Sequence, residues 1–459
     1  MRSTENRTAV RITPKQRRRS MRYVYIWAVH TLIGAICIGG NVLTLVALKL
    51  GATEVFLGML SFAMFGPWAF GIFTMSAIEK HGKRKILIFW LVVSTLFIIP
   101  LFFLPFLVNR WSANACLILI LTTIFLRTAA DALGHTGWFP LLQDIVPRRI
   151  TGRFFANLRV AWQTSSFITL LLVAWFLGKE PDWWKFEVIF IVAFIAFTIR
   201  LLTVFGMAEN PVPQAVSKKL SIFARFREVL RAEQLRQLVL YIISYMFALV
   251  IAEPFKIKFL KDIGYGDGFI LAATSMVALG AIVSLRFWGK LADKFGNHSI
   301  FSISHIGIAV FTMLWLFVGK SAFSAVFVFG LFFFWSVFNS GNGIAQTRYI
   351  MHAVPANKQN QINIINVIAI ITVGIAPLFG GLFLKLTNNI SFQLSAKTIN
   401  NYHFLFIISA VMFILPHLLR RKLKSKKDTP TMQVIAFVTR PLRNMFGPFM
   451  GSTRRNARR

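Results

Sequence analysis

The stretch Gly289-Lys290-Leu291-Ala292-Asp293-Lys294-Phe295-Gly296-Asn297-His298 lies between two long apolar segments of this 459-residue chain. A shorter polar stretch of the same kind, Glu79-Lys80-His81-Gly82-Lys83-Arg84, lies between two apolar segments of the first half. In both, an acid and a lysine stand three and two positions before a glycine, and Gly296 follows Gly82 by 214 positions (296 minus 82). A polar turn repeated after about half the chain favours a duplicated membrane protein whose hinges lie at these turns.

The apolar content of the chain places it in a membrane. Its hydrophobic fraction is 56% and it has 48 Phe, whereas soluble domains are roughly 45–50% apolar even with glycine counted. Crossing the hydrocarbon takes about 20 apolar residues, and every span must be a helix because lipid offers the backbone no hydrogen bonds. The sequence therefore predicts an all-α protein with about twelve spans, near residues 23–48, 54–78, 86–108, 115–141, 154–178, 187–207, 237–260, 268–288, 299–319, 322–349, 362–386 and 402–419.

The net charge of +35, from 51 Lys and Arg against 16 Asp and Glu, reflects membrane topology. Such a charge would indicate nucleic-acid binding in a soluble protein. Here the cations flank apolar segments, as the positive-inside rule requires, so we expect no nucleic-acid partner and place both termini in the cytoplasm. The basic loops and tail are expected to contact anionic lipid headgroups.

Charge and hydropathy also predict the domain boundaries. We expect a basic tail over 1–22, six-helix bundles over 23–207 and 237–420, a central loop over 208–236 and a second basic tail over 421–459. Within the central loop, Leu220, Phe223, Phe226 and Leu230 recur at helical spacing, which predicts an amphipathic helix on the membrane surface. The last segment is expected either to lie on anionic lipid or to be disordered.

Several classes of chemistry lack a signal in the sequence. The two cysteines, Cys37 and Cys116, cannot form a disulfide framework or a metal cluster, so we expect neither a metal nor a cofactor. The sequence has no phosphate-binding Gly-x-x-x-x-Gly-Lys-[Ser/Thr] run and no motif of hydrolytic enzymes, and we expect a protein that is not an enzyme. No cleavage site or presequence is evident, which favours a retained first helix and a bacterial inner membrane.

The duplication extends beyond the turns. Aligning Val146-Pro147 with Val354-Pro355 gives an offset of 208 positions (354 minus 146), close to that of the turns. This alignment pairs Asp131 with Asn339 and Trp138 with Gln346, on the fourth and tenth predicted helices. Internal repeats of this size are typical of transporters.

The second turn resembles the loop motif of the major facilitator superfamily, Gly-x-Leu-Ala-Asp-Lys-x-Gly-x-[Arg/Lys]. His298 takes the last position, and the first turn has Met75 and Ala77 where the motif has Gly and Leu. The resemblance covers about residues 20–420. It implies two pseudo-symmetric six-helix bundles around a central path and a secondary transporter that works by alternating access.

An acid just past a helix end can pair with cations on neighbouring helices, and glycine allows the close approach of a tight turn. Such pairs would fasten the outward-facing arrangement and open in the inward-facing one. The alternative is a solvated loop placed by charge alone. The predicted gating residues are Glu79, Lys80, Gly82, Arg84, Gly289, Asp293, Lys294 and Gly296.

Ionisable groups inside a span are costly and usually face a cavity or a partner. Arg127, Asp131 and His135 are spaced by four on the fourth helix, so they share one face. They form either a substrate or proton site or a structural ion pair. In the family, an arginine on this helix opens an Arg-x-x-x-Gly pattern associated with proton coupling in antiporters; here Asp131 replaces that glycine.

The tenth helix offers an opposing set of amides, which either bind solute or join helices. Asn41, Trp162 and Gln163 could complete the cavity, and Trp138 could stack on a ring, although a tryptophan is more often part of a core. Glu253 is expected at the outer rim. The amides are Asn339, Asn342 and Gln346.

The function predicted from the sequence is secondary transport of a small solute by a monomer, driven by protons on the evidence of Asp131 and His135, with sodium as the alternative coupling ion. One alternative is a lipid-handling protein such as a flippase. Another is a receptor or scaffold that uses a transporter fold without transport, because fold does not fix function.

Overall fold

In the part of the chain that this computed structural model describes, twelve helical segments are long and apolar enough to cross a membrane, as the sequence predicts. The structure describes residues 12–210, 222–354, 360–394, 397–423 and 433–434. The spans of the first half are α1 (Pro14–Cys37) with α2 (Gly40–Lys49), α3 (Glu54–Phe65) with η1 (Gly66–Thr74), α5 (Lys83–Leu96) with α6 (Ile99–Phe102) and α7 (Leu104–Leu107), α8 (Ala113–His135) with α9 (Trp138–Ile145), α10 (Thr151–Leu177) and α11 (Trp183–Phe205).

The second half has the same number of spans. They are α13 (Glu233–Val250) with α14 (Glu253–Asp262), α15 (Asp267–Phe295), α16 (Asn297–Met313) with η3 (Leu314–Phe317), α17 (Ala322–Ala353), α18 (Asn360–Leu386), and α19 (Asn401–Met412) with α20 (Ile414–Leu419) and η5 (Arg420–Lys422). Shorter helices lie between spans: α4 (Met75–His81), η2 (Arg148–Ile150) and α12 (Ile222–Arg231).

Local sequence explains where the helices begin and break. The first span begins at Pro14, earlier than the predicted residue 23, because Thr13 and Gln16 form a capping box and proline suits the first helical turn. The third span is interrupted before Pro100 and Pro105, since proline lacks the N–H that continues a helix. The arginines assigned to a tail over 1–22 therefore belong partly to α1.

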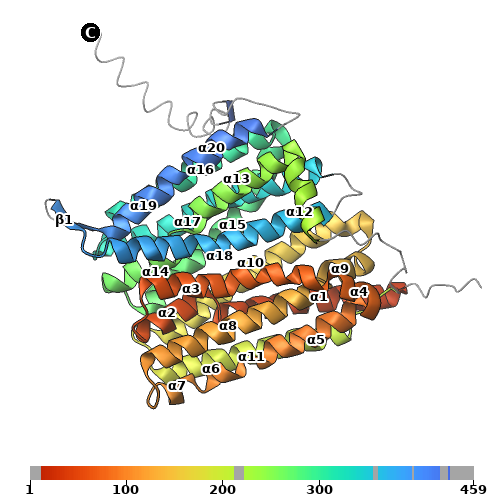
Figure 1. Cartoon of the computed structure of the whole chain (residues 1–459), viewed down its shortest axis with the longest axis horizontal. Helices are drawn as coiled ribbons and strands as arrows, with labels where there is room; N and C mark the ends of the chain where they lie inside the picture. Colours follow the sequence, from red (N-terminus) through yellow and green to blue (C-terminus); the bar gives the residue numbers. More distant parts are fainter. Residues whose placement is uncertain (1–11, 211–221, 355–359, 395–396, 424–432, 435–459) are drawn as a thin grey trace, which may run out of the picture.

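A small antiparallel hairpin, which the sequence analysis did not predict, connects the last two spans. Strand β1 (Ser391–Leu394) pairs with β2 (Lys397–Asn400), with Ser391 opposite Asn400. We call the end of the molecule that carries this hairpin, α2 and α14 the hairpin end. The opposite end, which carries α4, α9 and α12, is the α12 end (Figure 1).

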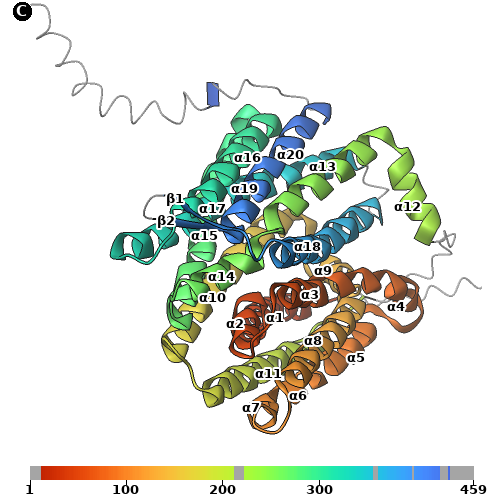
Figure 2. The same ribbon diagram turned by 60° about the vertical axis from the view of Figure 1, so that its left-hand side comes forward.

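The two halves form two groups of helices side by side (Figures 1 and 2). The second span, α3, packs against the eleventh, α18, and the fifth, α10, packs against the eighth, α15. A span and its counterpart in the other half are six spans apart, so α3 corresponds to α15 and α10 corresponds to α18. The contact between α3 and α18 is therefore the counterpart of the contact between α15 and α10. The arrangement thus has the pseudo-symmetry expected of a duplicated chain.

Among the described residues, buried apolar side chains form one cluster shared by both halves and two that are not shared. The shared cluster lies at the hairpin end and contains, for example, Leu57 and Phe190 of the first half and Phe255 and Phe406 of the second. Toward the α12 end, the first half has a cluster around Trp27 and Trp138, and the second half has another around Tyr241. The halves are therefore fused through their cores at the hairpin end.

Helix α12 was predicted to lie on the membrane surface, but its apolar face is at least partly covered by protein. Val229 is fully buried and Phe226 packs against the core of the second half. Leu230 is exposed, whereas Leu220 and the side chain of Phe223 lie outside the described residues. In the predicted basic tail, Val434 is buried in the same core.

Candidate functional site

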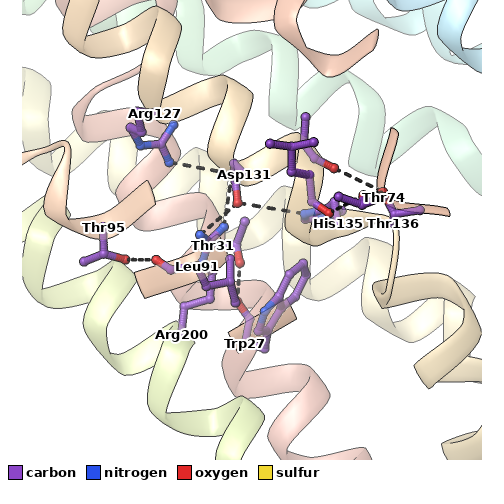
Figure 3. Close-up of polar contacts among 12 residues, drawn as sticks. Trp27, Thr31, Thr74, Leu91, Thr95, Arg127, Asp131, His135, Thr136 and Arg200 are labelled. Atoms are coloured by element: carbon purple, nitrogen blue, oxygen red, sulfur yellow. Dashed lines mark hydrogen bonds and ion pairs between the residues drawn. The ribbon is translucent and has the colours of Figure 1, made fainter. Parts of the chain in front are cut away.

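The ionisable residues of the fourth span lie together on one face of α8, as their spacing predicts. Arg127 Nη2 is 3.8 Å from Asp131 Oδ2, and His135 Nδ1 is 4.0 Å from Asp131 Oδ1 (Figure 3). Asp131 is 6% exposed, so its charge is almost completely removed from solvent. A buried carboxylate requires opposite charge and hydrogen bonds nearby.

The main partner of Asp131 is Arg200 of α11, which sequence reasoning missed. Arg200 Nη2 donates to Asp131 Oδ1 at 3.0 Å, and Nη1 donates to Oδ2 at 3.3 Å (Figure 3). Two parallel bonds of this kind are the strong bidentate form of an arginine–carboxylate pair. The available signal was the position of Arg200 inside the sixth apolar segment, where an ionisable residue indicates a partner.

Aromatic rings enclose this cluster. The guanidinium carbons of Arg127 and Arg200 lie 4.2 and 4.6 Å from the ring centroid of Phe197, within cation–π range. The ring of His135 lies 5.5 Å from Trp27 and 5.0 Å from Trp68, between centroids. The cluster joins α8 to α11 and provides a protected site where a proton or charge would alter several contacts together.

A cavity of about 640 Å³ lies beside the cluster, between α1, α9 and α10. Trp138, Trp162 and Gln163 line it, which brings together three of the predicted path residues. Trp138 is buried and stacks on Trp27 with 3.6 Å between centroids. Asn41 does not line this cavity; it lies on α2, and none of the described hydrogen bonds joins it to the α8 cluster.

The predicted amides on α17 bond to tyrosines on α13. Tyr245 Oη donates to Asn339 Oδ1 at 2.7 Å, and Tyr241 Oη donates to Asn342 Oδ1 at 2.7 Å. The Nδ2 group of Asn342 donates to Gln346 Oε1 at 3.4 Å. The two tyrosine bonds join α13 to α17 within one half, as the helix-joining alternative for the amides predicts, whereas the bond from Asn342 to Gln346 lies within α17.

Buried His305 of α16, another residue that sequence reasoning missed, completes this second polar cluster. Its Nε2 atom lies 3.0 Å from Tyr241 Oη and 3.1 Å from Asn342 Oδ1. Asn339 and Asp131 were aligned by the repeat, and both form polar contacts with a second helix of their own half. Each half therefore has a buried polar cluster among its described residues.

Both turns of the repeat contain a glycine that an L side chain would strain. Gly82 has φ of 89° and Gly296 has φ of 87°, in the region that favours glycine. Lys83 Nζ is 2.6 Å from Asp144 Oδ2 of α9, and its backbone N–H donates to Glu209 Oε1 at 2.5 Å. The first turn is thus fastened to its own half.

The other predicted residues of the first turn contribute differently. Arg84 donates to the carbonyl oxygen of Met207 at 2.9 Å, whereas Lys80 is exposed. The side chain of Glu79 lies outside the described residues.

In the second turn, Asp293 pairs with Arg348 of α17. The predicted turn is shorter than expected, because Gly289 through Phe295, with Asp293 and Lys294, are the last residues of α15. Asp293 therefore lies within the last turn of a helix and not beyond it. Each glycine turn is thus followed or preceded by a charged residue that pairs with another helix of the same half, Lys83 with Asp144 and Asp293 with Arg348.

The contacts between the halves that involve hydrogen bonds or charge, among described residues, lie at the hairpin end. Lys258 Nζ of α14 is 3.4 Å from Glu54 Oε1 of α3, and Tyr402 Oη lies 3.5 Å from the same oxygen. The N–H of Gly268 donates to the carbonyl oxygen of Gly178 at 2.6 Å. Glu253, predicted at the outer rim, lies at this end and pairs with Lys256.

No group of three or more metal-ligating side chains occurs among the residues whose placement the structure gives. The polar clusters are built from ion pairs and hydrogen bonds between side chains.

Comparison with known proteins identifies the family. The sequence profile of the Major Facilitator Superfamily matches residues 29–369. An uncharacterized MFS-type transporter, YuxJ of Bacillus subtilis (strain 168), is 24% identical over 238 residues, a match that covers 48% of this chain and only 54% of that protein.

Solved structures share the fold at low sequence identity. The nucleoside transporter NupG has a TM-score of 0.66 at 11% identity, over 88% of this chain and 100% of NupG. A D-xylose–proton symporter has a TM-score of 0.66 at 13% identity, over 90% of this chain and 98% of the other. With a matching profile over most of the chain and twelve membrane-length helices, this multi-pass membrane protein belongs to the major facilitator superfamily.

Proposed function

We propose that this protein is a secondary active transporter that moves a small solute by alternating access. The observation that carries the proposal is the distribution of the core. One apolar cluster spans both halves at the hairpin end, whereas each half has its own cluster toward the α12 end. Two bodies fused at one end only can rock about a central site.

The contacts at the fused end are of a kind that can separate and re-form. The ion pair between Lys258 and Glu54 is accessible enough to exchange for water, with side chains 15% and 26% exposed. Beside it, a Cβ on Gly58 would lie 2.8 Å from the carbonyl oxygen of Pro377. At this point the backbones of α3 and α18 meet without a side chain of Gly58 between them, which favours a contact that can slide or part.

We assign the α12 end to the cytoplasm. Two basic segments lie at this end, because an even number of spans returns the chain to the side on which it began. They are the start of α1, with Arg17, Arg18, Arg19 and Arg22, and the segment Arg420–Lys422. The positive-inside rule places such residues in the cytoplasm. The arrangement closed at the hairpin end is then inward-facing, in a bacterial inner membrane.

Proton coupling is the second part of the proposal. Asp131 and His135 are the groups on α8 that can bind a proton, and the charged groups that face them are Arg127 and Arg200. A proton on Asp131 would weaken its pairs with both arginines and free α11 from α8. The D-xylose–proton symporter that shares the fold uses protons, as its name states, and this supports the assignment.

Reconstituted vesicles test the proposal. We expect counterflow of a labelled solute that depends on a pH gradient. The rate of this counterflow should fall in both Asp131→Asn and His135→Gln. Scrambling of labelled phospholipid without solute flux would replace the transporter by a lipid-handling protein. Ligand binding with no flux in either direction would replace it by a receptor.

A further inference from the structure

The cavity between α1, α9 and α10 contains one charged side chain among its described lining, Arg159. Arg159 has no ion pair or hydrogen bond with a described residue, in contrast to Arg127 and Arg200, which share Asp131. The side chain of Arg159 is exposed, and a charged side chain within a membrane span usually faces a water-filled cavity or a partner.

The direction of Arg159 follows from the contacts of its helix. At 3.6 residues per turn, Ile168 and Trp175, which are 50% and 82% exposed, lie on roughly the opposite side of α10 from Arg159. Ser165 contacts Val29 of α1, and Ala174 contacts Gly268 of α15, on the two flanks. Arg159 therefore faces the cavity between α1, α9 and α10, away from the side of α10 that carries Ile168 and Trp175.

The rest of the lining suits a flat apolar body. Trp27, Trp138 and Trp162 surround the cavity together with Phe139 and Phe155. Gln163, one residue from Trp162, adds a neutral donor and acceptor near Arg159. The volume of about 640 Å³ falls within the range of small-molecule sites.

We propose that this cavity binds a small organic anion that carries an aromatic ring, with Arg159 holding the carboxylate and the tryptophans holding the ring. An arginine offers a planar pair of donors that matches a carboxylate. The inference rests on the proposed transport function, since it assigns the class of solute, but binding can be measured without transport.

The test is a binding series on purified full-length protein in detergent, with three probes that share one ring system. They are 2-naphthoate, the neutral 2-naphthylmethanol and the cationic 2-naphthylmethylamine. Binding is measured by titration calorimetry and by the shift in thermal unfolding, because a ligand of the folded state stabilises it. The expected order is naphthoate first, then the alcohol, with the amine weakest.

Variants separate the roles of charge and ring. Arg159→Gln is expected to weaken naphthoate binding about tenfold to a hundredfold, the range for a charge-assisted hydrogen bond, and to leave the alcohol unchanged. Trp162→Leu is expected to weaken both probes. The matched controls are Arg153→Gln and Trp175→Leu, on the same helix but outside this cavity, and both should bind as the unmodified protein does.

Equal binding of naphthoate and the alcohol, or naphthoate binding that survives Arg159→Gln, would overturn the proposal while leaving transport intact. Arg159-dependent displacement of naphthoate by phosphatidylglycerol in nanodiscs would assign the site to a lipid headgroup and also overturn it. Absence of flux with naphthoate binding as expected would instead remove the transport function alone.

Discussion

Arg200 donates two hydrogen bonds to Asp131, at 3.0 and 3.3 Å, although 69 positions of sequence separate the two residues. Arg200 is fully buried and Asp131 nearly so. The pair therefore ties the fourth span to the sixth, and neither charge can be removed alone without leaving the other in a low-dielectric interior.

The first prediction concerns this pair. Arg200→Met is expected to lower the free energy of unfolding by about 3–5 kcal/mol, because Asp131 keeps only the more distant Arg127 and His135. Adding Asp131→Leu and Arg127→Met to Arg200→Met should recover most of the loss, because replacing Arg127 as well leaves no buried guanidinium without its partner Asp131. Thermal and denaturant unfolding in detergent measure both variants. Arg153→Met, at an exposed position, is the control, and a triple variant as unstable as the single one would contradict the argument.

The second prediction concerns the close approach of α3 and α18. Gly58→Ala would place a methyl group 2.8 Å from the carbonyl oxygen of Pro377, so the halves must part at the hairpin end. Gly330→Ala meets no atom within 4 Å and should have no effect. Spin labels on Arg110→Cys and Lys320→Cys report the distance between the two halves at this end. The two native cysteines are buried, so the labels are directed to the introduced cysteines. If Gly58→Ala leaves the distribution of distances between the two labels unchanged, the interface at the hairpin end does not part as proposed.

The third prediction compares two glycines at the second turn. Gly296 has φ of 87°, so Gly296→Ala is expected to cost about 1–2 kcal/mol and to lower transport. Gly289 lies inside α15, where an added side-chain carbon would meet no atom within 4 Å, so Gly289→Ala should stabilise the helix by about 0.5–1 kcal/mol. Unfolding midpoints and counterflow rates check both. Equal effects of the two substitutions would refute the distinction.

The fourth prediction separates gating from stability at Asp293. The side chains of Asp293 and Arg348 are 73% and 34% exposed, so breaking the pair should change stability by about 0–1 kcal/mol. We expect Asp293→Asn to insert normally and to transport more slowly. Exchanging the charges, with Asp293→Arg and Arg348→Asp, should restore part of the rate. Normal counterflow by Asp293→Asn would show that the pair has no role in the cycle.

The path residues were located by sequence with uneven success. Arg127, Asp131 and His135 lie together because residues four apart share a helix face, which is a local property. Trp162 and Gln163 line one cavity with Trp138 because α9 and α10 are neighbours in the fold. Asn41 was assigned to the same cavity because it lies within a predicted span. The depth of a residue in the membrane does not determine the direction in which its side chain points.

The sequence by itself determined the twelve spans, the duplication and the glycine turns, because hydropathy, repeat spacing and the backbone preference of glycine can be read from the order of residues along the chain. Only the tertiary structure decided that Arg200 meets Asp131, that Tyr245 meets Asn339 and that Lys258 meets Glu54 across the halves. The physical reason is that an apolar segment is hydrophobic all round. The composition of such a segment predicts that it crosses the membrane. The partners of its few polar side chains depend on the rotation of the helix about its own axis, which is fixed only by packing against neighbouring helices.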